Sequence, residues 1–140
     1  YSNRLKVEII SKGIIFMLKE ILSEILKVDD VLFVVKGGGA VSEIRSNSLG
    51  IRQKDQWITI GENDGPCHMH INSDLIKKAQ FITEEKPERT SFSVRFFDEK
   101  DDRVLGAFFT KMYDENKNLK QDRKKLYDDL NSKYGDTIEF

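Results

Sequence analysis

Hydrophobic residues recur at three- and four-residue steps in two stretches, one near each end of the chain, and this spacing is typical of amphipathic helices. The first stretch predicts a helix over about residues 12–27, with apolar positions at Ile14, Leu18, Ile21, Leu22 and Ile25. The alternating Leu5, Val7 and Ile9 before it fit either a short strand or a lead-in to this helix. The second stretch predicts a helix over about residues 119–134, and Gly135 follows it at a position typical of helix terminators.

Between the two predicted helices, short apolar runs alternate with turn residues, as they do in antiparallel strands. The predicted strands are Val31–Lys36, Ala40–Arg45, Gly50–Gln53, Trp57–Ile60, a strand within Gly65–Ile71, Ala79–Thr83, Ser91–Phe97 and Val104–Met112. Helices segregated from an antiparallel sheet define the α+β class. We therefore expect a single α+β domain over residues 1–140, with an antiparallel multi-stranded sheet flanked by an N-terminal and a C-terminal helix.

The amino-acid composition argues against two classes of binding partner, nucleic acids and membranes. The 140 residues include 23 basic and 24 acidic side chains, and the formal net charge of −1 gives no reason to expect a nucleic-acid partner. The apolar runs are far shorter than the roughly 20 residues that span a bilayer, so no membrane partner is expected either. One cysteine cannot form an internal disulfide, which favours a reducing compartment and a cytoplasmic location. The chain opens at Tyr1 rather than at methionine, so the sequence leaves open whether residues upstream are missing.

The stretch Gly65–Ile71 contains both histidines and the only cysteine of the chain. Side chains alternate faces along a strand, so His68 and His70 are expected to point one way and Cys67 the other. This alternation argues against a thiolate–imidazole pair, and the sequence shows no other nucleophile pattern, so catalysis is the less favoured interpretation. A zinc site needs a third or fourth ligand beside the two imidazoles. Haem iron needs only one or two axial protein ligands, usually histidine, and an ordinary exposed polar pair is the alternative.

From His70 to Phe109, the sequence resembles the bacterial haem-utilisation proteins of the HemS/ChuX type. The similar segments are a strand histidine with a polar turn and an apolar strand at His70–Ile82, the strand Ser91–Phe97 before an acidic turn, and the strand Val104–Tyr113. The resemblance implies an α+β fold, a cytoplasmic role in carrying or processing haem, and a homodimer. It makes His70 the candidate axial ligand of haem iron and Lys111 a candidate partner of a haem propionate. His68 and Arg95 are the further candidates for cofactor binding.

The leading prediction is therefore a small cytoplasmic haem-binding or haem-trafficking protein. The alternative is a non-catalytic, dimeric α+β interaction module that binds no haem, and in that case both histidines are ordinary surface residues. An enzyme acting on a small molecule ranks third, because the sequence offers no defensible nucleophile or base. Since a ligating imidazole must be neutral, haem binding is expected to weaken in acid.

Overall fold

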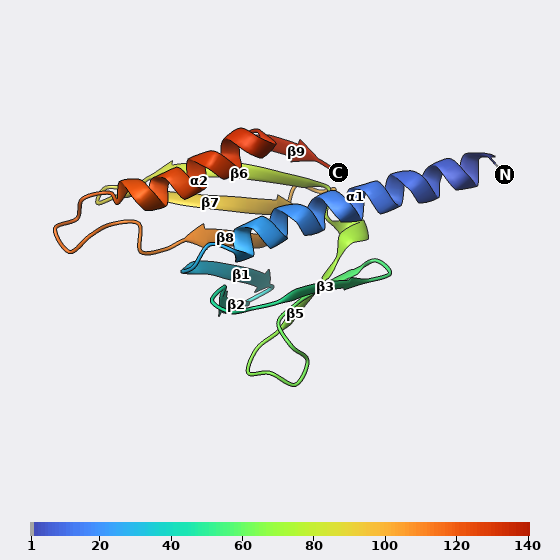
Figure 1. Ribbon diagram of the computed structural model, residues 1–140, viewed down its shortest axis with the longest axis horizontal. Coiled ribbons are helices and arrows are strands. Elements are labelled where there is room, and N and C mark those ends of the chain that lie inside the picture. Colours follow the sequence, from blue (N-terminus) through green and yellow to red (C-terminus); the bar gives the residue numbers. More distant parts are fainter. Residues whose placement is uncertain (1) are drawn as a thin grey trace.

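The computed structural model describes the backbone of residues 2–140 and the side chains of residues 13–140. This part of the chain forms two α-helices, α1 (Ser2–Leu26) and α2 (Gln121–Tyr134), with two antiparallel sheets (Figure 1). The six-stranded sheet has the order β2-β1-β8-β7-β6-β9, and the three-stranded sheet has the order β3-β4-β5. The strands are β1 (Val31–Gly37), β2 (Ala40–Arg45), β3 (Ile51–Lys54), β4 (Trp57–Ile60), β5 (Met69–Asn72), β6 (Lys78–Glu85), β7 (Thr90–Phe97), β8 (Arg103–Phe109) and β9 (Thr137–Glu139). The predicted α+β class is confirmed.

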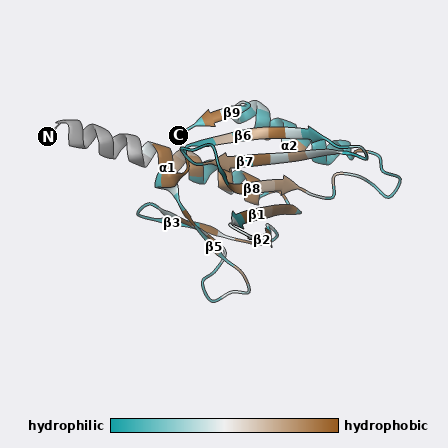
Figure 2. Ribbon diagram, turned by 180° about the vertical axis from the view of Figure 1, so that it is seen from behind, coloured by the Kyte–Doolittle hydropathy of each residue, from teal (hydrophilic) through white to brown (hydrophobic). Residues whose placement is uncertain are grey.

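Strand alternation gives the six-stranded sheet two different faces. The first, the helix face, carries buried residues such as Phe33, Phe96 and Phe109. Leu22 of α1 and Tyr127 of α2 belong to the same core cluster as these residues, so both helices cover this one face (Figure 1). The central strands β1, β7 and β8 are mostly hydrophobic, whereas the connecting loops are hydrophilic (Figure 2). The opposite side, here called the open face, carries polar residues beside apolar ones.

The strand that carries the histidine is shorter than predicted. Because β5 begins at Met69, Cys67 and His68 lie in the preceding loop. That loop closes on Gly61, whose φ of +87° lies in the left-handed region, and a Cβ there would be only 2.5 Å from the Cys67 carbonyl oxygen. Only glycine permits this close approach. Within the strand, Met69 is buried and His70 is exposed, so the predicted alternation of faces is confirmed there.

Other boundaries differ from the predicted ones for local reasons. Helix α1 begins at Ser2, so the interpretation of residues 5–9 as a lead-in to the helix is confirmed. The physical reason is that extending a helix already formed does not require the costly step of nucleating a new one. Strand β8 ends at Phe109 rather than Met112, since Lys111 has a φ of +53° that a strand does not accommodate. Strand β9 was not predicted because its three residues include a single apolar position.

The expected single antiparallel sheet instead divides into two sheets, and the chain leaves the larger sheet at Ser46. This serine is fully buried; its hydroxyl accepts a hydrogen bond from the Val31 N–H at 3.1 Å and donates one to the Val28 carbonyl at 3.0 Å. These bonds tie the end of β2 to the start of β1 and turn the chain towards β3. The physical cause of the division is therefore a tertiary contact that strand spacing does not reveal.

Replacing Ser46 with alanine is expected to lower the free energy of unfolding by about 1–3 kcal/mol, because two buried backbone groups lose their partner. Urea denaturation measures the loss. Ser42→Ala on the exposed strand β2 is the matched control, with an expected change below about 0.5 kcal/mol. Equal changes in the two variants would contradict the role given to the Ser46 hydroxyl.

Candidate functional site

The three-stranded sheet has one buried and one outward face. Ile58, Ile60, Met69 and Ile71 are buried on the inner face. Residues directly opposite one another in an antiparallel pair share a face. The register pairs Arg52 with Thr59, Thr59 with His70, Lys54 with Trp57, and Trp57 with Asn72. The outward face, here called the histidine face, therefore consists of Arg52, Lys54, Trp57, Thr59, His70 and Asn72.

The imidazole of His70 is held in place by the neighbouring strand. Its Nδ1 lies 2.8 Å from the Oγ1 of Thr59, and the Thr59 residue is itself 7% exposed. When Nδ1 carries the proton, it donates to this hydroxyl and the Nε2 lone pair is free. A hydrogen bond at one ring nitrogen is the usual way in which a histidine ligand is oriented for iron or zinc at the other. His70 is therefore an exposed imidazole with a fixed ring, and in the tautomer with the proton on Nδ1 its Nε2 is available to a ligand.

His68 stands beside His70, although it belongs to the loop before β5. The two ring centroids are 5.2 Å apart and the rings meet edge to face. Among the residues whose side chains are described, no group of three or more histidine, cysteine, aspartate or glutamate side chains is placed to hold a metal ion. The pair therefore falls short of the ligand number of a protein-only zinc site. A metal complex that brings its own equatorial ligands does not have this requirement.

A small pocket of about 150 Å³ lies beside His70. Its walls are mostly apolar and come from Val35, Met69, Ile71, Leu75, Ile76, Val104 and Leu105, together with Asn72. Pockets that enclose a drug-sized ligand have volumes of about 300–1,000 Å³, so a flat ligand of that size does not fit inside this one.

Comparison with known proteins places this fold in a family. A protein-family model matches residues 19–135. Among solved structures, the haem-binding protein ChuX has a TM-score of 0.70 at 13% identity, covering 83% of this chain and 71% of ChuX. A protein from Agrobacterium tumefaciens has a TM-score of 0.69 at 23% identity, covering 85% of this chain and 67% of its own. The chain belongs to a HemS/ChuX-like family.

The HemS/ChuX-like fold also occurs within longer proteins. ChuS, a haem oxygenase from E. coli, has a TM-score of 0.63 at 14% identity, and the match covers 80% of this chain but 35% of ChuS. No curated protein sequence matches this chain significantly. In the described part of the chain, neither helix combines the length and apolar content required to cross a bilayer.

Two of the predicted HemS/ChuX-type site residues lie away from the histidine face. Arg95 is on the open face of the six-stranded sheet, with its guanidinium 2.9 Å from a Glu84 carboxylate oxygen. Lys111 follows β8, with its ammonium 3.1 Å from a carboxylate oxygen of Asp30. Hydrogen bonds from these cations hold the pKa of Glu84 and the pKa of Asp30 below their usual range. The structure therefore brings His68 and His70 together and places Arg95 and Lys111 elsewhere.

Of the histidine face, sequence reasoning singled out only His70; Trp57 and Lys54 are among the members it missed. The indole of Trp57 is 43% exposed, which is unusual for so large an apolar side chain. Trp57 directly precedes the buried Ile58 in the same strand, and neighbouring side chains of a strand point to opposite faces. This pattern could have predicted that the indole points outward. Lys54 could not be placed so readily, because only the β3–β4 register brings it opposite Trp57.

A larger groove, of about 490 Å³, lies between α1 and β3. It is lined by Ile15, Phe16, Lys19, Glu20, Ser23 and Gln53. Phe16 is 70% exposed although it belongs to an otherwise amphipathic helix. Gln53 pairs with Ile58 on the buried face of the small sheet, so this groove is on the side away from His70. The groove and the histidine face are therefore separate surfaces.

Proposed function

We propose that this protein binds haem and acts in haem trafficking or utilisation, with Nε2 of His70 as an axial ligand of the iron. The observation that supports this most strongly is the fixed, exposed imidazole on β5, with Nδ1 hydrogen-bonded to Thr59. The fold similarity to the haem-binding protein ChuX adds support. Haem supplies iron with four ring nitrogens, so a single imidazole satisfies its minimum protein requirement.

The rest of the histidine face suits a porphyrin. The exposed indole of Trp57 offers a flat apolar surface on the strand next to His70. Lys54, exposed and opposite Trp57, offers a cation to a propionate carboxylate. His68, 5.2 Å from His70 between ring centroids, is a second imidazole on the same side. These four residues make up the proposed haem-contacting set.

The proposal includes three further points. The protein is cytoplasmic, in keeping with its single cysteine. It is a homodimer, as the HemS/ChuX resemblance implies, and the exposed Phe16 of α1 is the candidate interface residue. Light scattering of the purified protein measures its molar mass and so distinguishes a dimer from a monomer. Arg95 and Lys111 lie away from this face and are not part of the proposed set. Their role as cofactor contacts stays a prediction, which glutamine variants of each, titrated with hemin, test.

Titration of the purified protein with hemin is expected to give a sharp, saturable Soret band at one haem per chain. The band should weaken as the solution is made acidic, because the ligating imidazole must be neutral. A non-saturating rise in absorbance, like that of hemin in a protein lacking a site, would overturn the proposal. That result would favour the alternative of an interaction module, for which the groove lined by Phe16 is the supporting observation.

A further inference from the structure

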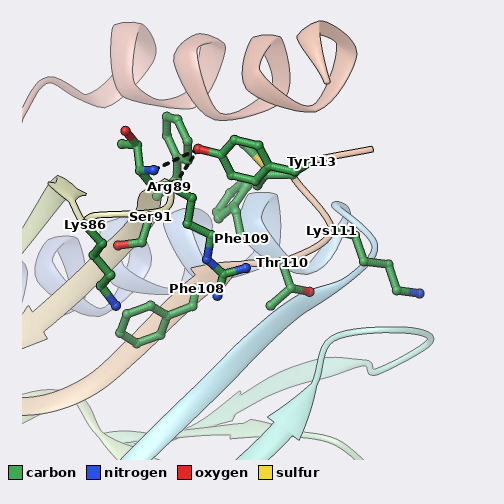
Figure 3. A pocket seen from close by; sticks show the side chains of 11 residues that line it. Lys86, Arg89, Ser91, Phe108, Phe109, Thr110, Lys111 and Tyr113 are labelled. Carbon is green, nitrogen blue, oxygen red and sulfur yellow. Dashed lines mark hydrogen bonds between the residues drawn. The ribbon is translucent and has the colours of Figure 1, made fainter. Parts of the chain in front are cut away.

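We propose that the open face of the six-stranded sheet carries a second, independent site, which binds the carboxylate or phosphate group of a small-molecule anion beside Phe108. The site is a hollow of about 140 Å³ where β7 begins and β8 ends (Figure 3). Residues from the β6–β7 hairpin and from the segment after β8 line it. The His70 pocket, by contrast, contacts the opposite end of β8 at Val104 and Leu105.

The ring of Phe108 forms one wall of this hollow, and Gly106 makes room for it. Both residues are on the open face of β8, and a Cβ at Gly106 would be 2.6 Å from the ring carbon Cε2 of Phe108. The guanidinium carbons of Arg95 and Arg103 lie 5.5 and 5.4 Å from the ring centroid. Cations at this distance interact favourably with the ring face. The aromatic wall is thus held between two arginines.

Four basic side chains lie around Phe108: Lys86 and Arg89 line the hollow with it, and Arg95 and Arg103 lie over its ring. The side chains of Lys86 and Arg89 extend towards Phe108, whereas Lys111 points away (Figure 3). Among the side chains described, Lys86, Arg89 and Arg103 form no ion pair, while Arg95 is paired with Glu84. Burial, and then the charge of Arg95, lower the pKa of Arg103. An anion would complete the charge balance of this cluster.

An unsatisfied hydroxyl adds a neutral donor. The Ser91 Oγ is buried and has no hydrogen-bond partner among the described residues. The neighbouring Tyr113 hydroxyl is not available as a partner for Ser91. It already accepts a hydrogen bond from the Thr90 N–H at 2.9 Å and donates one to the Thr90 carbonyl at 2.8 Å. Buried polar groups are rarely left without a partner, so this hydroxyl marks a place for a bound acceptor.

Size and charge decide which anion fits. The hollow of about 140 Å³ is well below the roughly 300–1,000 Å³ of pockets that enclose drug-sized ligands, so it admits a carboxylate or phosphate group with a short apolar arm. A nucleic acid is disfavoured, because the chain has a net charge of −1 and the basic cluster is compact. Guanidinium and hydroxyl donors then bind the oxygens through charge-assisted hydrogen bonds.

The test is an NMR titration of the full chain with sodium phosphate and, separately, with succinate, at constant ionic strength. At least one anion is expected to give saturable amide shifts confined to residues 86–92 and 108–113, and the two arms distinguish phosphate from carboxylate sources. Arg89→Gln is expected to weaken binding about 10- to 100-fold, because a charge-assisted hydrogen bond is lost. Ser91→Ala should also weaken binding without lowering thermal stability, since its hydroxyl has no partner in the free protein.

Two control variants distinguish anion binding at this site from non-specific attraction between charges and from haem binding. Lys36→Gln removes an exposed cation that does not line the hollow, and it should leave anion binding unchanged. His70→Ala should also leave it unchanged, whatever that variant does to hemin binding. Linear, non-saturating shifts with both anions, or equal losses in Arg89→Gln and Lys36→Gln, would overturn the proposal.

Discussion

Replacing Tyr127 with alanine is expected to lower the free energy of unfolding by about 3–5 kcal/mol, the range for large-to-small aromatic substitutions in a core. Tyr127 is 1% exposed, and its ring meets Phe81, Phe92 and Phe109 edge to face at centroid distances of 5.6, 5.3 and 5.1 Å. Its hydroxyl donates to the Ser93 carbonyl at 2.9 Å. One side chain therefore anchors α2 to three strands.

Urea denaturation with near-ultraviolet circular dichroism measures this loss. Tyr127→Phe keeps the ring and removes only the hydroxyl, so its expected loss is about 0.5–1.5 kcal/mol. Leu126→Ala is the control on the same helix, because Leu126 is 44% exposed, and its expected change is below about 0.5 kcal/mol. A Tyr127→Ala loss as small as the Leu126→Ala loss would contradict the packing described.

The same residue links stability to alkaline pH. Burial raises the pKa of the Tyr127 hydroxyl in the folded protein, so the folded state favours the neutral phenol. Its contribution is fully present below the unfolded pKa of about 10 and is lost as pH rises above that value. Tyr127→Phe cannot ionise at this position, so the stability difference between wild type and this variant should shrink above pH 10. A difference that stays constant to pH 11 would contradict the assignment.

Replacing His70 with alanine is expected to reduce hemin affinity by about a hundredfold or more. Loss of a residue that only hydrogen-bonds to a metal ligand typically reduces metal affinity about 10- to 100-fold. Because His70 is the proposed ligand itself, its loss should have at least the larger effect. Thr59→Val, which keeps the shape but removes the hydroxyl bonded to Nδ1, should show that smaller, roughly tenfold effect. His68→Ala is the matched control, because this imidazole is adjacent and exposed but lacks the bond to Thr59.

Optical titration with hemin measures all three affinities. The expected order of loss is His70→Ala, then Thr59→Val, then His68→Ala. A larger loss for His68→Ala than for His70→Ala would transfer the proposed ligand role to His68. Unfolding curves of the apo-proteins show whether a loss of hemin affinity arises from a destabilised fold. Replacing an exposed histidine is expected to change the free energy of unfolding by less than about 0.5 kcal/mol.

Local periodicity predicted most of the elements, because burial on one face shapes the sequence residue by residue. The alternation at Met69, His70 and Ile71 was therefore visible, as was the terminator role of Gly135, which has a φ of +84°. The division into two sheets was not visible, because it depends on the hydroxyl of Ser46 reaching the strand β1. Periodicity carries no information about such distant partners.

The same limit applies to the functional residues. The bond between His70 and Thr59 exists because β4 and β5 pair in one particular register, and the sequence does not specify that register. The grouping of Arg95, Arg103 and Phe108 depends likewise on the pairing of β7 with β8, including the register shift at Phe96 and Phe97. Single residues with distinctive chemistry were found from sequence, and their partners required the structure.

Chemical rescue of His70→Ala tests the central claim most directly. The visible spectrum of this variant with one equivalent of hemin is recorded before and after addition of free imidazole. The account predicts that the variant lacks the sharp Soret band of the wild type and that imidazole restores it by occupying the vacated axial position. A His70→Ala spectrum and affinity equal to those of the wild type, without imidazole, would contradict ligation by His70.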